Sequence, residues 1–314
     1  MSMHKLDSPY SGKDFISIIV LSFQRAEHTF NLLQSLHTVG GMPMEIIVVD
    51  DASSDKQVQQ MLYQNLPAIS TVILNSGGNR GFTNAANQAT ALCNSDYVLL
   101  LNNDIEMVGP GLPNVASALE LPYIGCLGVM GDAGFSGGPV VRRGNLNIEL
   151  NSNPRGSGAF AFRKEVWSKL GGFPERHHSA ADIGFFYSML KNGYFNGFIA
   201  DTPKMLRNRD QEENYANPTE GTSPFANGYP MLFGTNIDQW TQASLERRQR
   251  IHQRSTQDDK SVGGINNIEY WHYWFQEHHD QGKIIWEKDF LYGQEKFRPL
   301  IERDLAIGGA IEHG

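Results

Sequence analysis

The chain has 314 residues, 40% of them hydrophobic and 19% charged, which is typical of a globular protein with ample material for a core. A formal net charge of −8 at pH 7 excludes a general basic surface for nucleic acid. Two cysteines exclude a disulfide framework, and a polar start without any apolar run of about 18 residues predicts neither a signal peptide nor a membrane-spanning helix. We therefore expect a soluble, cytoplasmic protein.

Apolar runs and helical patterns alternate along the N-terminal third of the chain. Continuous apolar runs, rich in β-branched residues, predict buried strands over residues 15–21, 45–49, 71–74 and 97–101. Apolar residues at helical spacing predict three helices between them, at 30–39, 58–62 and 82–93. Strands that alternate with helices in this way form βαβ units with right-handed crossovers. The sequence therefore predicts an α/β fold with a mostly parallel sheet flanked by helices.

The pattern is looser after residue 106. It predicts strands at 124–130, 140–141, 156–162 and 198–200, and helices at 110–121, 164–170 and 181–191. Residues 207–236 are a long polar stretch, and helical character returns from residue 238 onward. We therefore divide the chain into an N-terminal tail over 1–14, an α/β domain over 15–236 and a helical C-terminal extension over 237–314.

Acidic and polar residues follow three of the predicted strands, at 50–51, 79–80 and 102–104. Because the carboxyl ends of parallel strands meet at one edge of a sheet, we expect these residues to converge there. A carboxylate at this edge can accept from a base or a ribose, Arg80 can donate to a phosphate, and Asp104 can hold Mg²⁺ or Mn²⁺. The alternative is a set of ordinary turn residues, with Arg80 paired to a neighbouring aspartate.

The sequence contains neither a G-x-G-x-x-G turn after its first strand nor a P-loop. Both motifs neutralise phosphates with backbone N–H groups of a glycine-rich loop. Their absence favours a metal ion as the group that neutralises a diphosphate.

An ordered series of short motifs resembles family 2 glycosyltransferases. The series comprises VVDDASSD at 48–55, NRGF at 79–82 with Asn84 and Asn87, LLNND at 100–104, and GAF at 158–160 followed by RKEV at 163–166 and GGF at 171–173. The resemblance covers about residues 15–200. It implies a GT-A fold, which is a Rossmann-like sheet flanked by helices. It also implies a nucleotide-sugar donor, a divalent cation and a direct displacement that inverts the anomeric centre.

The resemblance also assigns roles to residues at the strand ends. The family's donor pocket matches Ser22, Arg25, Asp51, Asn79, Arg80, Asn102 and Asn103. Within it, Asp51 contacts the base or the ribose, and Asp104 stands where the family carries its DxD-type metal ligand. The first acidic position of that motif is Asn102 here, which leaves one carboxylate fewer for Mn²⁺ or Mg²⁺.

The family's catalytic base precedes its last core helix, and the matching residue is Asp182. The resemblance implies that Asp182 deprotonates the acceptor hydroxyl. The acid that forms a pair with this base in the family is replaced by Ala181. The alternative is that Asp182 is a helix N-terminal aspartate, stabilised by the helix dipole.

From these features we expect an inverting, metal-dependent hexosyltransferase that uses a UDP-sugar. Its acceptor would be the hydroxyl of a glycan, a lipid-linked molecule or a protein, in surface glycan or polysaccharide synthesis. A binding module without turnover is the alternative, because Asn102 and Ala181 replace acids. A sugar-nucleotide pyrophosphorylase is a further alternative, but SFQRAEH at 22–28 is not the glycine-rich loop that such an enzyme needs.

Several residues outside the main motifs are also candidates for function. Arg207 or Arg209 is a candidate to neutralise the diphosphate. The arginines of 247–254 offer peripheral contact with an anionic membrane, with a solvated helix face as the alternative. Aromatic residues over 270–275 predict a core or homodimer contact. We expect Asp50 to be a turn partner rather than a ligand.

Overall fold

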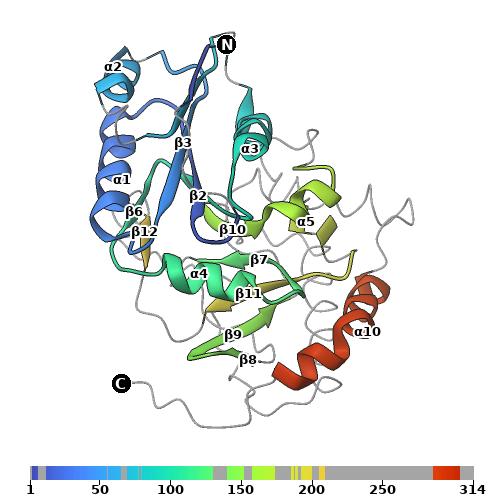
Figure 1. Ribbon diagram of the computed structural model, residues 1–314. Coiled ribbons are helices and arrows are strands. Elements are labelled where there is room, and N and C mark those ends of the chain that lie inside the picture. Colours follow the sequence, from blue (N-terminus) through green and yellow to red (C-terminus); the bar gives the residue numbers. More distant parts are fainter. Residues whose placement is uncertain are drawn as a thin grey trace, which may run out of the picture.

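The structure is a computed structural model, and it describes residues 2–5, 12–54, 56–64, 69–76, 78, 80–129, 140–151, 158–173, 185–186, 188–189, 192–199, 205–208 and 286–304. At their centre lies a ten-stranded mixed β-sheet with helices on both faces (Figure 1). Its strand order is β1-β4-β3-β2-β5-β10-β7-β11-β9-β8, and β12 pairs with β6 in a small second sheet. The predicted α/β fold class is therefore confirmed.

The elements have the following bounds. The strands are β1 (Ser2–Lys5), β2 (Ile16–Ser22), β3 (Met44–Asp50), β4 (Thr71–Leu74), β5 (Tyr97–Asn102), β6 (Ile105–Met107), β7 (Ile124–Gly128), β8 (Val140–Arg143), β9 (Leu146–Asn151), β10 (Ala159–Arg163), β11 (Phe195–Ile199) and β12 (Leu206–Asn208). The helices are α1 (Ala26–Val39), α2 (Lys56–Gln64), α3 (Gly81–Leu92), α4 (Leu112–Leu119), α5 (Lys164–Lys169) and α10 (Trp286–Asp304).

Strands β4, β3, β2 and β5 are parallel neighbours, so their carboxyl ends meet at one edge of the sheet. We call this the carboxyl edge and define it by Ser22, Asp50, Leu74 and Asn102, the last residues of the four strands. Strand β10 then pairs antiparallel with both β5 and β7, and β11 is parallel to β7. The parallel half is the part that brings the polar strand ends together.

The sheet has an apolar layer on each face, which explains the continuous apolar runs. In β2, Ile18 and Val20 pack into the layer that includes residues of α1, α2 and α4. Ile19, which points the other way, packs with residues of α3 and with a group of phenylalanines. A strand that is covered on both faces has no solvent-facing positions, so its sequence is apolar throughout.

Helix α10 packs against the body of the sheet domain. Ile301 is fully buried in the core, and Phe297 packs against both apolar layers. The Tyr123 hydroxyl donates to the Asp304 carboxylate over 2.9 Å. The predicted boundary at residue 237 lies outside the described residues.

The four predicted strands of the N-terminal half lie where the sequence placed them, within one residue at each end. Four short strands were not predicted: β1, β6, β9 and β12. Strand β1 falls in the stretch that we assigned to a tail, and it pairs antiparallel with β4 at the edge of the sheet. Backbone pairing at an edge requires no apolar side chains, so the polar sequence of β1 gives no strand signal.

Candidate functional site

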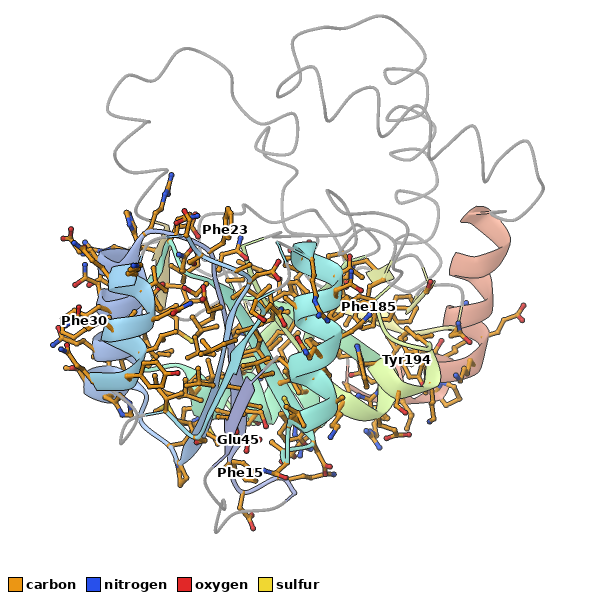
Figure 2. The ribbon with its side chains drawn as sticks, turned by 90° about the horizontal axis from the view of Figure 1, so that it is seen from above. Phe15, Phe23, Phe30, Glu45, Phe185 and Tyr194 are labelled. Atoms are coloured by element: carbon orange, nitrogen blue, oxygen red, sulfur yellow. The ribbon has the colours of Figure 1, made fainter. Side chains whose placement is uncertain are left out.

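The carboxyl edge brings the predicted polar residues to the same level of the sheet. Ser22 is paired in register with Asp50, and its neighbour Leu21 is paired with Asn102. Figure 2 shows Phe23 at this end of the strands, with Phe15 and Glu45 at the opposite end. The site therefore begins with three adjacent strand ends and the loops that leave them.

Asp51 is bound to the N-terminus of α3. Its carboxylate accepts hydrogen bonds from the backbone N–H groups of Arg80, at 2.9 and 3.0 Å, and of Gly81, at 2.8 Å. It also accepts from the Asn75 side chain at 3.0 Å, and Asp51 is only 6% exposed. Negative charge at a helix N-terminus is stabilised by the helix dipole. Asp51 therefore fixes the loop before α3, and any contact with a nucleotide is made in addition to these bonds.

Asp50 points into a buried turn. Its carboxylate accepts hydrogen bonds from the Ser53 hydroxyl and from the Ser53 N–H. Burial raises the pKa of this carboxyl above its ordinary value, while the bonds from Ser53 act in the opposite direction. These contacts are those of a turn partner.

The loop between β5 and β6 carries the predicted metal ligand. Asn103 and Asp104 form a turn there, and both are half-buried. The Asn103 side-chain amide donates to the Gln24 carbonyl and to the Thr29 hydroxyl, each at 3.3 Å. The backbone N–H of Asn102 donates to the Gly158 carbonyl at 2.8 Å, which ties the end of β5 to the start of β10. The turn that carries the Asp104 carboxylate is therefore held by hydrogen bonds to the start of α1 and to the residue before β10.

Two loops at this edge contain residues in the left-handed backbone region. Gln24, Arg25 and Ala52 have φ angles of 57°, 54° and 65°. Non-glycine residues rarely adopt such angles, and they do so mainly where the surrounding structure holds them in place. Here the Gln24 N–H donates to the Ser53 hydroxyl at 2.7 Å, and the Gln24 side chain donates to Ser54 at 3.0 Å. The loops after β2 and β3 are thereby locked together.

Phe23 is a candidate site residue that our sequence analysis missed. Its side chain is 45% exposed and lies immediately beyond the end of β2. An aromatic ring exposed beside polar groups is a stacking surface for a planar base. The signal was present in the sequence, because Phe23 directly follows Ser22, the polar residue after the apolar run at 15–21.

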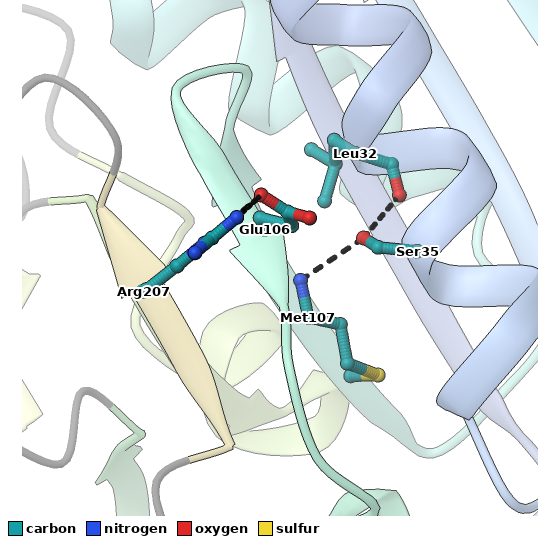
Figure 3. A network of polar contacts seen from close by, with 5 residues as sticks. All are labelled: Leu32, Ser35, Glu106, Met107 and Arg207. Carbon is teal, nitrogen blue, oxygen red and sulfur yellow. Dashed lines mark hydrogen bonds and ion pairs between the residues drawn. The ribbon is translucent and has the colours of Figure 1, made fainter.

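Arg207 lies beside Glu106 rather than at a strand end of the main sheet. Its guanidinium donates to the Glu106 carboxylate through Nε at 3.0 Å and Nη2 at 2.7 Å (Figure 3). Strand β12 pairs with β6 at this point. The ion pair therefore fastens β12 to the segment that follows the Asp104 turn.

Of the other predicted residues, two are described by the structure and the rest are not. Arg25 and Arg80 are both exposed at the carboxyl edge, at the N-termini of α1 and α3. Asn79, Ala181, Asp182 and Arg209 lie outside the described residues, as do the arginines of 247–254 and the aromatic residues of 270–275.

The donor set suits a hard divalent cation that is shared with a phosphate ligand. No group of three or more His, Cys, Asp or Glu side chains that could hold a metal ion occurs within the described part of the chain. Asp104 supplies one carboxylate, with amide oxygens at Asn102 and Asn103 beside it in sequence. Mg²⁺ is commonly held by one or two carboxylates together with substrate phosphates and water. The residues present fit that arrangement and not an all-protein cage.

Comparison with known proteins identifies the family. The model of glycosyl transferase family 2 matches residues 17–190, which is more than half of the chain. The chain therefore belongs to glycosyl transferase family 2. An uncharacterized glycosyltransferase of Haemophilus influenzae is 26% identical over 198 residues, which are 60% of this chain and 66% of that protein. The uncharacterized glycosyltransferase YwdF of Bacillus subtilis is 30% identical over 106 residues, 33% of this chain and 38% of that protein. The chain thus spans less than two thirds of each relative.

Solved structures share the fold at low sequence identity. S. aureus TarS 1-349 in complex with UDP is 18% identical and has a TM-score of 0.55, over 92% of this chain and 86% of that chain. GalNAc-T7 with UDP, GalNAc and Mn²⁺ is 12% identical and has a TM-score of 0.50, over 84% of this chain and 55% of that chain. Among the helices that the structure describes, none is both long enough and apolar enough to cross a membrane.

Proposed function

We propose that the protein transfers a sugar from a nucleoside diphosphate donor to an acceptor hydroxyl, with inversion at the anomeric carbon. The observation that carries the proposal is the carboxyl edge, where Ser22, Asp50 and Asn102 end adjacent parallel strands. Membership of glycosyl transferase family 2 supports the reaction class. UDP is the favoured leaving group, and the complexes of TarS with UDP and GalNAc-T7 with UDP support this choice.

The donor would lie across the ends of β2, β3 and β5. Phe23 would offer its exposed ring to the base, Asp51 would contact the base or the ribose, and the Arg80 guanidinium would donate to a phosphate oxygen. Ser22, Arg25, Asn79, Asn102 and Asn103 complete the proposed pocket. Asp104 is the proposed ligand of Mn²⁺ or Mg²⁺, an ion that would stabilise negative charge on the leaving diphosphate.

Asp182 is the proposed general base. It takes the proton of the acceptor hydroxyl while the hydroxyl oxygen forms its bond to the anomeric carbon. The bond from that carbon to the diphosphate oxygen breaks on the opposite face, and the electron pair leaves with the nucleoside diphosphate. We propose a hexose as the transferred sugar and a glycan, lipid-linked molecule or protein as the acceptor.

A binding module without turnover is the second candidate, because Asn102 and Ala181 stand where acids are expected. The structure argues against the pyrophosphorylase alternative. Helix α1 begins at Ala26, four residues after β2 ends at Ser22. The short intervening loop leaves no room for a glycine-rich phosphate cradle.

Incubation with a panel of nucleotide sugars and Mn²⁺, followed by detection of the released nucleotide, tests the proposal. A transferase releases nucleotide slowly to water and faster with an acceptor, whereas a binding module binds donor and releases none. We expect Asp182→Asn to retain donor binding and lose transfer. Full transfer by that variant would remove Asp182 from the mechanism.

A further inference from the structure

Thr29 is a buried hydroxyl at the junction of two loops of the proposed site. It lies in the first turn of α1 and is completely buried. Its Oγ1 is 2.9 Å from the Ser22 hydroxyl at the end of β2. The same oxygen accepts from the side-chain amide of Asn103 at 3.3 Å. Thr29 therefore joins the end of β2 to the turn that carries Asp104.

The hydrogen-bonding capacity of a hydroxyl suits this position. A threonine hydroxyl has one donor and two acceptor positions, so it can accept from Asn103 and still exchange a hydrogen bond with Ser22. The Thr29 and Ser22 hydroxyls are both buried, and an unpartnered buried polar group costs about 1–3 kcal/mol. The hydrogen bonds of Thr29 therefore favour one arrangement of the end of β2 and the β5–β6 turn.

The same helix holds the other side of the Asp104 turn. The Ser35 hydroxyl accepts from the backbone N–H of Met107 at 3.0 Å and donates to the Leu32 carbonyl at 2.7 Å (Figure 3). Asp104 thus lies between two residues that are bonded to α1. Asn103, before it, is bonded to Thr29, and Met107, after it, is bonded to Ser35. A carboxylate on a turn that is held in this way is pre-arranged for a ligand.

We propose that Thr29 is a positioning residue for the metal-binding turn. This proposal rests on the proposed role of Asp104. With Asn102 in place of an acid, the described β5–β6 turn supplies one carboxylate at Asp104, and metal affinity then depends strongly on how well that turn is pre-arranged. Groups that orient metal ligands typically contribute about 10- to 100-fold to metal affinity. Thr29 contacts neither metal nor donor and acts through Asn103.

Calorimetric titration with UDP, with and without Mn²⁺, tests this inference. We expect Thr29→Val to reduce the manganese-dependent gain in UDP affinity about tenfold. UDP affinity without metal should change less than about twofold, because the two hydrogen bonds that are lost, to Ser22 and Asn103, are bonds within the protein and not to the donor. Thr29→Ser keeps the hydroxyl and should retain the gain. Thr38→Val is the matched control, because Thr38 lies on the same helix and bonds the Gln34 carbonyl at 2.9 Å.

The outcomes separate the inference from the proposed function. Equal loss of UDP affinity with and without Mn²⁺ in Thr29→Val would overturn the positioning role, as would an unchanged manganese-dependent gain. If the parent protein itself shows no manganese-dependent gain, the metal role of Asp104 fails first. Should Thr29→Val not fold, as shown by a lost thermal transition, Ser22→Ala removes the other partner and should lower the gain in the same direction. A normal gain in folded Ser22→Ala would then count against the network.

Discussion

Phe23 and Asp51 follow adjacent strands and have opposite surroundings. The ring of Phe23 is 45% exposed, whereas the carboxylate of Asp51 is buried against the N-terminus of α3 and accepts from three protein groups. A residue that stacks on a base needs exposed ring area. A carboxylate that holds a loop uses its acceptor positions for hydrogen bonds to protein groups. At the residue scale, we therefore propose that Phe23 stacks on the base, and that Asp51 holds the loop in addition to its proposed contact with the base or ribose.

Phe23→Ala tests the stacking role. Loss of an aromatic platform for one base costs about 1–3 kcal/mol, so we expect UDP affinity to fall about tenfold while the melting temperature stays close to that of the parent. Tyr63 on α2 is 49% exposed and provides the matched control, since Tyr63→Ala removes an exposed ring away from the strand ends. Equal UDP affinities of the two variants in calorimetry would contradict the assignment.

Asp104→Ala tests the metal role at the same scale. The substitution removes the carboxylate from the β5–β6 turn, so we expect Mn²⁺ to give no further increase in UDP affinity. Affinity without metal should be close to that of the parent, because the base contact at Phe23 is retained. An undiminished response to Mn²⁺ in the titration would show that another group holds the ion.

At the element scale, Asn87 of α3 fastens the turn after α5. Its side-chain oxygen accepts from the Trp167 indole at 3.1 Å and from the Phe173 N–H at 2.8 Å. Its amide nitrogen donates to the Phe173 carbonyl at 2.8 Å. The ring of Phe173 then packs 4.7 Å from that of Phe185, measured between centroids. This contact holds both flanks of the segment that contains Asp182 in sequence.

A pair of glycine substitutions tests the Asn87 contact. Gly171 and Gly172 have φ angles of 78° and 87°, so alanine is strained at either position. A Cβ on Gly171 meets nothing within 4 Å, whereas one on Gly172 lies 2.8 Å from the Asn87 side-chain oxygen. We expect Gly171→Ala to cost about 1 kcal/mol of unfolding free energy and Gly172→Ala about 2–4 kcal/mol. Equal costs in urea denaturation would show that the contact contributes little.

The elements also show how far the sequence was informative. Strands β2 to β5 were predictable because each is an apolar run covered on both faces, and their parallel order placed the strand ends together. Strands β6 and β12 have three residues each and lie about 100 positions apart, so no local pattern marks them. The contact between Thr29 and Asn103 spans 74 positions and depends on where α1 packs. The positive φ angles of Gln24 and Ala52 have no residue-type signal either.

At the scale of the whole molecule, α10 packs on the sheet domain from the far end of the chain. Phe297 lies between Tyr123 and Tyr194, at 6.3 and 5.9 Å between ring centroids. The Lys296 ammonium lies 4.6 Å from the centre of the Tyr194 ring and donates to the Asn192 carbonyl at 3.0 Å. Helix α10 thus belongs to the same folded unit as the sheet.

Ile301→Ala tests whether α10 and the sheet unfold together. Ile301 is fully buried, so its truncation should cost about 2–5 kcal/mol and lower the single thermal transition of the whole domain. Glu302→Ala, at the exposed neighbouring position, removes an i,i+4 pair with Arg298 and should cost less than about 1 kcal/mol. A separate early transition for α10, with the main transition unchanged, would contradict the packing.

A crystal structure of the protein with UDP and Mn²⁺ tests the central claim most directly. The account predicts uracil against the ring of Phe23, the diphosphate over the ends of β2 and β5, and the ion bound by the Asp104 carboxylate. A nucleotide bound elsewhere on the molecule, or an ion held without Asp104, would contradict it.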